Sequence, residues 1–174
     1  MTTIWTIGHS TRSIDEFTAA LQRFDIELIV DVRRFPGSRR LPQFSSESLK
    51  NSLTNSGISY CWIPALGGRR RPISTADDSA WRNDAFRGYA DHIATEEFSE
   101  GLFELLMLSS GLNTVIMCAE VLWWRCHRRI ISDVLVSLGR SVVHIRDESH
   151  SEMHKLAPPA RLVDGTVAYT ILSV

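Results

Sequence analysis

Five short apolar segments, separated by stretches of helical character, constrain the fold of this chain more than any other feature. The segments are residues 4–7, 28–30, 58–63, 114–118 and 142–145. Between the first two, apolar residues recur at helical spacing, namely Phe17, Ala20, Leu21 and Phe24. Strands that alternate with helices predict right-handed crossovers and a parallel sheet with helices on both faces. We therefore expect one α/β domain over residues 1–174, with a mostly parallel five-stranded sheet.

Helix boundaries can be placed from capping residues and glycines. Ser13 and Glu16 have the spacing of a capping box, in which each side chain bonds the backbone of the other residue. A second helix begins at Ser45 or Ser46 and is expected to stop at Gly57. Residues 80–110 predict two helices, because Thr95 is followed by two acidic residues and forms a good cap for the second.

The last part of the chain has a different character from the alternating segments. Residues 157–160 include two prolines and predict irregular structure, whereas the helix from Arg128 is expected to end at Gly139. Asp164 and Gly165 lie between short apolar runs, which predicts a small C-terminal hairpin. The sequence contains no internal repeat and no linker that would divide it into two domains.

Composition limits the class of protein. The formal net charge is −1, so the whole molecule has no field that would draw it onto nucleic acid, and any anion binding must be local. The chain begins without a basic region followed by an apolar run, and no apolar run is long enough for a bilayer. Three cysteines, an odd number, argue against a disulfide framework. We therefore expect a cytoplasmic protein that does not contact a membrane.

Polar and reactive side chains follow the apolar segments where each predicted strand ends. The residues at these exits that we select as site candidates are His9, Ser10, Asp31, Arg33, Arg70, Cys118, Glu120, Cys126, His127 and Arg128. The carboxyl ends of parallel strands lie along one edge of a sheet, where open α/β folds bind their ligands. We therefore expect these side chains to converge on one crevice, although some of them are ordinary residues of solvated turns.

The chemistry of these residues suggests two kinds of role. His9, Asp31 and Glu120 are candidates for acid–base catalysis, and Cys118 is the candidate nucleophile. The anion-binding candidates are Ser10, Arg33, Arg70, Cys126, His127 and Arg128. Guanidinium groups match phosphate and carboxylate geometry, and a helix that begins at residues 127–128 directs backbone N–H groups toward an anion. Arg34, Arg39, Arg40, Arg69 and Arg71 extend the same loops into a basic rim.

Cys118 permits three interpretations. It is a small buried apolar residue, or a nucleophile whose thiol pKa is lowered by Arg125, Arg128 or a helix N-terminus, or a metal ligand with Cys126 and His127. The spacing between the two cysteines is not that of a standard zinc site. Six residues separate Cys118 from Arg125, which is the wrong length for a phosphatase-type loop. We expect no bound metal and no cofactor.

Trp123 and Trp124 precede the predicted helix that begins near Arg128. The pair either packs as a lid, or contacts another chain, for example in a homodimer, or stacks on a nucleic-acid base. The first two interpretations are favoured over the third.

Several stretches along nearly the whole chain carry a resemblance to a known family. These are Thr6-Ile7-Gly8-His9-Ser10, Asp31-Val32-Arg33 with Pro36 and Ser38, Leu66-Gly67-Gly68 with Arg70, Phe86 with Tyr89-Ala90, Met117-Cys118-Ala119-Glu120, Cys126-His127-Arg128, and Val143-His144-Ile145 with His154. In these stretches the chain resembles the bacterial and archaeal family named domain of unknown function 488. The resemblance implies a compact α/β domain with polar loops, and no general activity has been assigned to the family. Residues 121–125 depart from it, because similar proteins usually carry a polar turn there.

The sequence therefore predicts an enzyme that acts on a phosphate-bearing substrate, a nucleotide or nucleic acid, in a crevice at the strand ends. One alternative is a nucleic-acid-binding module without chemistry of its own. Another is an interaction scaffold that uses the Trp123-Trp124 patch.

Overall fold

The computed structural model describes residues 2–37, 39–75 and 79–170, so Ser38, one residue of the family resemblance, lies outside the described ranges. Six strands form the main sheet: β1 (Thr3–Gly8), β2 (Leu28–Asp31), β3 (Ser59–Trp62), β4 (Thr114–Cys118), β5 (Ser141–Ile145) and β6 (Ser151–Met153). Their order across the sheet is β3-β2-β4-β1-β5-β6. The expected α/β class and mostly parallel sheet are confirmed.

The first five strands are parallel, and β6 is antiparallel to β5 at one edge. The predicted sheet had five strands, so β6 is an addition to it. Its residues, Ser151, Glu152 and Met153, have no apolar alternation that would identify a strand. The strand forms because the turn after β5 folds the chain back along that strand's open edge.

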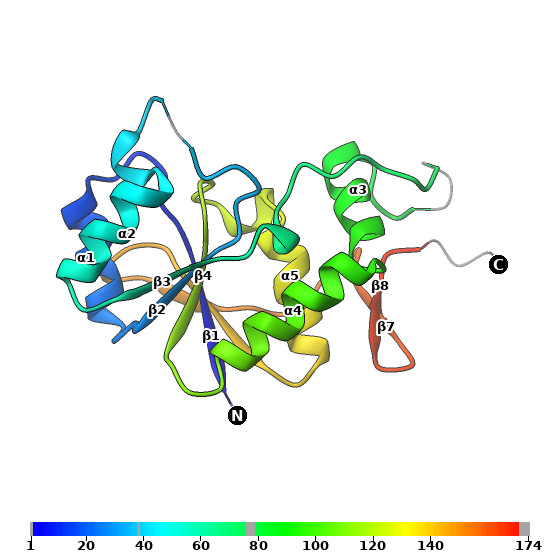
Figure 1. Ribbon diagram of the computed structural model, residues 1–174. Helices are drawn as coiled ribbons and strands as arrows, with labels where there is room; N and C mark the ends of the chain where they lie inside the picture. Colours follow the sequence, from blue (N-terminus) through cyan, green and yellow to red (C-terminus); the bar gives the residue numbers. More distant parts are fainter. Residues whose placement is uncertain (1, 38, 76–78, 171–174) are drawn as a thin grey trace.

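The described residues form five helices: α1 (Ile14–Arg23), α2 (Ser46–Asn55), α3 (Asp84–His92), α4 (Glu96–Leu108) and α5 (Arg128–Ser137). Figure 1 shows α1 and α2 on one side of the strands, with α4 and α5 on the other. Single turns of 3₁₀ helix occupy residues 42–44, 64–66 and 123–125. Within the described residues, none of the helices has the length and apolar character to cross a membrane.

Alternate side chains of each strand point to opposite helix layers, as the pleat requires. Ile7, Ile29, Val115 and Met117 belong to the core under α1 and α2. The second core, under α4 and α5, includes Ile4, Val30, Ile116 and Val142. The central strands are buried on both faces, which is typical of a parallel sheet and explains their nearly continuous apolar sequence.

The predicted helix ends are confirmed by their capping contacts. The hydroxyl of Ser13 accepts a hydrogen bond from the Glu16 backbone N–H at 3.2 Å, while Glu16 Oε2 accepts from the Ser13 N–H at 2.8 Å. Thr95 caps α4 through the backbone N–H of Phe98. Gly57 and Gly139 follow α2 and α5 with φ angles of +74° and +75°, a conformation that favours glycine.

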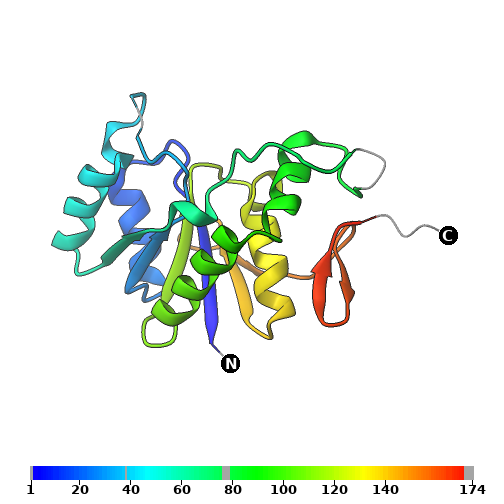
Figure 2. The ribbon, with the colours of Figure 1, turned by 45° about the vertical axis from the view of Figure 1, so that its right-hand side comes forward.

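The expected C-terminal hairpin is present as β7 (Arg161–Val163) and β8 (Thr166–Ala168). Asp164 and Gly165 both have positive φ, which is the turn geometry that matches the twist of paired strands. Val167 and Tyr169 are buried in the same core as α5. Figure 2 shows the hairpin beside α5, so the end of the described chain closes one side of the molecule.

Candidate functional site

The loops that leave neighbouring strands are joined by backbone hydrogen bonds. The His9 N–H donates to the Cys118 carbonyl at 2.9 Å, and the Ser10 N–H donates to the Ala119 carbonyl at 3.0 Å. Val32, after β2, donates in the same way to Met117 at 3.0 Å. The strand exits predicted to converge are therefore side by side, and their order follows from the sheet order β2-β4-β1.

Gly8 allows this close approach at the end of β1. A Cβ atom on Gly8 would lie 1.9 Å from the Glu120 carbonyl oxygen and 2.7 Å from the Val121 Cα. Both are backbone atoms, so a side chain could be admitted only if the loop moved away. The position therefore requires glycine because of contact and not because of its φ angle.

Two adjoining cavities open at this edge of the sheet. The first, which we call the thiol cavity, has a volume of about 220 Å³ and is lined by Arg34, Gly68, Cys118, Cys126 and His127 in addition to the shared residues. The second, the arginine cavity, has a volume of about 590 Å³, and its lining includes His9, Ser10, Arg40 and Leu41 in addition to the shared residues. The two cavities share Arg33, Phe35, Arg69, Ala119 and Glu120.

Arg33 is held at the boundary of the two cavities by a buried ion pair. Asp31, at the end of β2, accepts from Arg33 Nη2 at 2.6 Å and from the Tyr60 hydroxyl at 2.7 Å. Arg33 Nη1 also donates to the Phe44 carbonyl at 2.8 Å. Burial lowers the pKa of Arg33, but its hydrogen bond and charge interaction with Asp31 produce a net rise. The bonds from Arg33 Nη2 and the Tyr60 hydroxyl are both to Oδ2 of Asp31, and Oδ1 accepts from the Arg33 backbone N–H at 3.0 Å and from Arg33 Nε at 2.9 Å, so Asp31 positions Arg33.

His9 lies in the arginine cavity as a neutral imidazole. Its ring stacks on Phe44 with centroids 4.2 Å apart. Nδ1–H donates to the Ser10 carbonyl at 2.8 Å, which leaves Nε2 to accept from Arg33 Nη1 at 3.3 Å. Burial lowers the pKa of His9 to about 4, and the hydrogen bond to the Ser10 carbonyl opposes this shift only in part. At neutral pH His9 is therefore a neutral imidazole, which can accept a proton but cannot act as an imidazolium acid.

Cys118 and Cys126 form a thiol pair in the thiol cavity. Their Sγ atoms lie 3.5 Å apart, and Arg128 Nε donates to both, at 3.1 Å to Cys118 and 3.3 Å to Cys126. Burial raises the pKa of Cys126, but the hydrogen bond from Cys118 and the charge of Arg128 outweigh it and hold that pKa well below its ordinary value.

Cys118 has the opposite shift. Burial, and then the hydrogen bond and charge of Cys126, raise the pKa of Cys118 well above its ordinary value. The opposite directions of the two shifts favour the thiolate on Cys126, with Cys118 as the thiol that donates to it. The sequence suggested a lowered thiol pKa for Cys118, but in the structure it is the pKa of Cys126 that is lowered. The reason is that Cys126 accepts the hydrogen bond that Cys118 donates.

Arg128, expected to bind an external anion, is fully buried under the loop that follows β4. Besides the two sulfur atoms, its guanidinium donates to the Thr6 hydroxyl at 3.1 Å and to the backbone carbonyl of Glu120. These groups surround the side chain inside the fold. These contacts hold Arg128 to the two sulfurs and to the Glu120 loop, and its side chain is not exposed to an external anion.

A chain of buried hydrogen bonds continues inward from Arg128. The Thr6 hydroxyl accepts from Arg128 and donates to His144 Nδ1 at 2.7 Å. His144 Nε2–H then donates to His154 Nδ1 at 2.9 Å, and His154 Nε2–H donates to Asp133 at 2.9 Å. Each group donates once toward Asp133, so both imidazole tautomers are fixed. Burial is the main cause that lowers the pKa of His144 to about 2.

The residues of this hydrogen-bond chain were not predicted as site residues, namely Thr6, His144, His154 and Asp133. Thr6 and His144 are direct partners in the β1–β5 register, and both side chains face α5. His154 follows β6, and the Tyr169 hydroxyl, after β8, completes the chain by donating to Asp133 at 2.5 Å. A polar threonine and a histidine inside two apolar strand segments could have indicated a buried polar contact. The sequence does not show that β1 and β5 are neighbours, so it does not show that these two residues pair.

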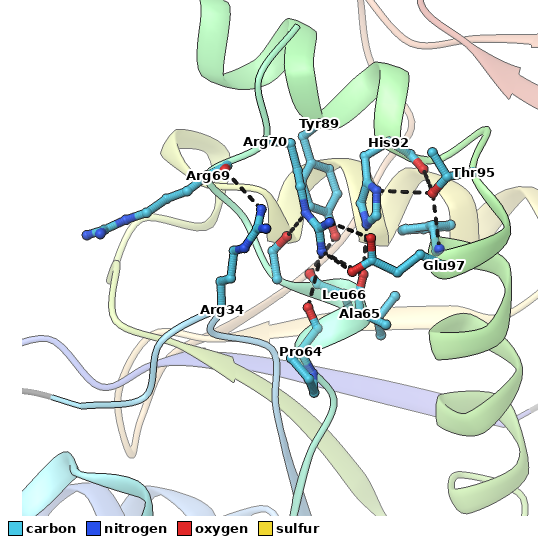
Figure 3. A network of polar contacts seen from close by, with 12 residues as sticks. Arg34, Pro64, Ala65, Leu66, Arg69, Arg70, Tyr89, His92, Thr95 and Glu97 are labelled. Carbon is cyan, nitrogen blue, oxygen red and sulfur yellow. Dashed lines mark hydrogen bonds and ion pairs between the residues drawn. The ribbon is translucent and has the colours of Figure 1, made fainter. Parts of the chain in front are cut away.

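Arg70, another anion-binding candidate, is part of a separate clamp (Figure 3). Its guanidinium forms two parallel bonds with Glu97 of α4, at 2.7 and 2.8 Å, and its Nε donates to the Gly67 carbonyl at 2.9 Å. Figure 3 shows Arg69 pointing away from Arg70 and Glu97, with Arg34 reaching the Arg69 carbonyl. Among the described residues, Arg69 rather than Arg70 lines the two cavities.

His127 and Cys126 lie together at the start of α5, but their side chains make different contacts. The His127 Nε2–H donates to the Val32 carbonyl at 2.9 Å, and burial lowers its pKa. A Cβ on Gly68 would lie 2.9 Å from His127 Nδ1, so the loop after β3 packs directly on this ring. Within the described ranges, no group of three or more His, Cys, Asp or Glu side chains is arranged to hold a metal ion.

Glu120 and Ser10 are at the rim. Glu120 is exposed, lines both cavities and accepts from the Leu122 backbone N–H at 3.2 Å through Oε1. Ser10 has a φ of 50° and lines the arginine cavity. Among the other lining residues, Arg34, Arg40 and Arg69 are predicted from sequence only as a basic rim, and Phe35 is not predicted at all.

Comparison with known proteins identifies a family for this chain. The model of the family described as domain of unknown function DUF488 matches residues 13–135. No curated protein and no solved structure matches the chain. The matched range contains Asp31, Arg33, Cys118, Cys126 and Arg128, so the exits of β2 and β4 and the start of α5 all fall within it. The chain belongs to the DUF488 family.

Proposed function

We propose that this protein is an enzyme that acts on a phosphate-bearing substrate, a nucleotide or a segment of nucleic acid, bound across the two cavities. The proposal rests on the convergence of four arginines, Arg33, Arg34, Arg40 and Arg69, with a thiol pair on adjoining hollows. Among the described lining residues, Glu120 is the only carboxylate. The mouth of the site is therefore positive although the whole chain has a net charge of −1.

The arginines contribute in two ways. Arg33 is fixed by Asp31 and by the Phe44 carbonyl, so it presents its charge without losing further side-chain freedom. Arg69 and Arg40 are exposed and Arg34 is half-buried, so they can close on a ligand as it enters. Paired guanidinium donors fit phosphate oxygens in two-point contacts, which favours phosphate over a simple halide ion.

The thiol cavity supplies the reacting group. A thiolate is the nucleophilic form of cysteine, and the low pKa of Cys126 favours that residue over Cys118 as the nucleophile. Cys118 donates a hydrogen bond to the Cys126 sulfur, and Arg128 Nε donates to both sulfurs. Glu120 is the candidate acid–base group, because it is exposed on the rim that both cavities share. His9 is the second candidate, as a neutral acceptor in the arginine cavity.

Calorimetric titration with ATP at two salt concentrations tests binding. Arg69→Gln and Arg34→Gln are each expected to weaken the affinity about tenfold, the loss of one charge-assisted contact. Arg71→Gln is the matched control, because Arg71 is exposed on the same loop and is not among the described lining residues. Equal affinities for Arg69→Gln and Arg71→Gln would contradict the proposed site.

Turnover is tested separately from binding. Incubation with nucleotides and a short oligonucleotide, followed by mass spectrometry of the products, is expected to show a change that Cys126→Ser abolishes. ATP binding that remains in Cys126→Ser would separate the binding groups from the reacting thiolate. A product formed equally by wild type and Cys126→Ser would exclude the thiolate from the reaction.

A non-catalytic nucleic-acid-binding module is a second candidate, and Phe35 favours it. Phe35 is 65% exposed, lines both cavities and has the Arg34 guanidinium 5.8 Å from its ring centroid. An exposed ring beside arginines can stack on an unpaired base. Phe35→Ala should then weaken binding of a single-stranded oligonucleotide by about 1–3 kcal/mol while leaving duplex binding unchanged. Salt-sensitive binding without any product would favour this function.

A further inference from the structure

The sulfur atoms of Cys118 and Cys126 are close enough to react with each other. Their Sγ atoms are in contact at 3.5 Å, both line the thiol cavity, and Arg128 Nε donates to both. We propose that Cys118 and Cys126 form a redox-active dithiol that reduces a small hydroperoxide and closes to an intramolecular disulfide. The proposal does not rest on phosphate binding, because no anion or arginine of the arginine cavity takes part.

The first step is oxidation of Cys126. Its thiolate attacks one oxygen of hydrogen peroxide, the S–O bond forms, the O–O bond breaks, and hydroxide leaves. Cys126 becomes a sulfenic acid, and two electrons have passed from sulfur to the peroxide. Arg128 Nε donates to Cys126 at 3.3 Å, and the hydrogen bond from Cys118 and the charge of Arg128 lower the pKa of Cys126, which favours the reactive thiolate form.

The second step closes the disulfide. The sulfur of Cys118 attacks the sulfur of Cys126, the S–S bond forms, and the S–O bond breaks. The departing hydroxyl takes the Cys118 thiol proton and leaves as water. In sum, one thiolate, one thiol and one hydrogen peroxide give a disulfide, one water and one hydroxide. The two sulfurs are already neighbours, so this step needs only small side-chain movements.

The environment selects a small oxidant. Cys118 is 3% exposed, and access to the pair is through a cavity of about 220 Å³ between Arg34, Gly68 and Glu120. Hydrogen peroxide fits this space, whereas a folded disulfide partner cannot bring its own sulfur to Cys118. Arg128 stays close to both sulfurs and can stabilise the thiolate before the reaction and the charge that develops on the leaving hydroxide.

Cys61 provides an internal control. It lies on β3, and its Sγ is 3.8 Å from Glu104 Oε1, on a different part of the molecule. Burial and the Glu104 carboxylate raise the pKa of Cys61, so its thiolate population is low at neutral pH. We expect it to remain a thiol under conditions that oxidise the pair.

The test is addition of one equivalent of hydrogen peroxide to the fully reduced protein, followed by alkylation in denaturant and intact-mass measurement. The expected product has lost two hydrogen atoms and retains one alkylatable thiol. Peptide mapping of the wild-type protein should find the Cys118 and Cys126 peptides joined in one monomer, with Cys61 alkylated. Three alkylated thiols after the peroxide has been added, or a disulfide that involves Cys61 or a second chain, would overturn the proposal.

Three variants assign the roles of the two sulfurs. Cys118→Ser should stop at the sulfenic acid, which dimedone traps on Cys126, and Cys126→Ser should form neither adduct nor disulfide. Cys61→Ser should oxidise as the wild type does. Dimedone labelling on Cys118 in place of Cys126 would contradict the order of steps. The result is independent of ATP titration, so failure here leaves the phosphate site standing, and the reverse also holds.

Discussion

The indole of Trp123 lies flat on the imidazole of His144, with ring centroids 4.0 Å apart and planes within 6° of each other. The Trp123 Nε1–H donates to Glu152 of β6 at 2.7 Å. Trp124, by contrast, is 37% exposed with the Arg146 guanidinium 5.7 Å from its ring. The two tryptophans therefore differ in their surroundings: Trp123 covers the buried histidines, and Trp124 is the exposed member of the pair.

Replacing Trp123 should destabilise the fold. Trp123→Ala removes the stack on His144 and the bond to Glu152, and we expect a loss of about 3 kcal/mol in the free energy of unfolding. Urea denaturation followed by circular dichroism measures it. Trp124→Ala is the control and should change stability by less than about 1 kcal/mol. Equal losses in the two variants would show that the contacts of Trp123 with His144 and Glu152 do not stabilise the fold.

The buried ion pair between Asp31 and Arg33 predicts a large asymmetry between two conservative substitutions. Asp31→Asn keeps the shape of the side chain but leaves the Arg33 charge unpaired, at a cost of about 3–5 kcal/mol. Tyr60→Phe removes a single hydrogen bond to Asp31 and should cost about 1 kcal/mol. Chemical denaturation of both proteins gives the comparison. An Asp31→Asn protein as stable as wild type would contradict the prediction that Arg33 depends on the Asp31 carboxylate for charge compensation.

Stability should fall with acidification in a window set by the histidines. An unfolded imidazole gains its proton near pH 6.5, whereas His9 and His144 in the fold have pKa values lowered by burial to about 4 and about 2. Below pH 6.5 the unfolded state therefore binds more protons, and the folded state is destabilised progressively down to pH 4, and further for His144. The free energy of unfolding measured between pH 7 and pH 4 should decrease.

His9→Gln tests the assignment, because it removes one of the two groups. Its stability should depend less on pH between 6.5 and 4 than that of the wild type. A profile parallel to that of the wild type would show that His9 titrates normally.

The contact at Gly8 predicts a strong effect of one methyl group. Gly8→Ala places a Cβ 1.9 Å from the Glu120 carbonyl oxygen, so the loop after β4 must move, and we expect a loss of at least about 3 kcal/mol. Gly111→Ala is the control, since its Cβ would meet nothing within 4 Å, and its effect should stay below about 1 kcal/mol. Thermal denaturation of both variants measures the difference in melting temperature. Equal melting temperatures would refute the contact.

The meeting of the strand exits at one edge of the sheet could be predicted from sequence because it depends on topology. Alternating strands and helices give a parallel sheet, and a parallel sheet gathers its loops at one edge. His9, Arg33, Cys118 and Glu120 meet in the structure for that reason.

The choice among similar side chains could not be predicted. Arg69 and Arg70 are adjacent and chemically identical, yet Arg69 faces the cavities and Arg70 pairs with Glu97. The difference arises from a φ of 59° at Arg69 and from a carboxylate that α4 brings from elsewhere in the chain. Arg128 is a similar case, because its burial depends on acceptors from β1 and from the loop after β4. Side-chain direction is decided by such distant partners.

The central place of β1 has a practical consequence for how the family is studied. The match begins at residue 13 and ends at residue 135, whereas β1 (Thr3–Gly8) lies between β4 and β5 (Ser141–Ile145) in the middle of the sheet. A fragment trimmed to the matched range would lack both strands and would leave the whole flank of β4 open to other chains. Such a fragment should aggregate, and a lack of activity or binding in the fragment would therefore not describe the intact protein.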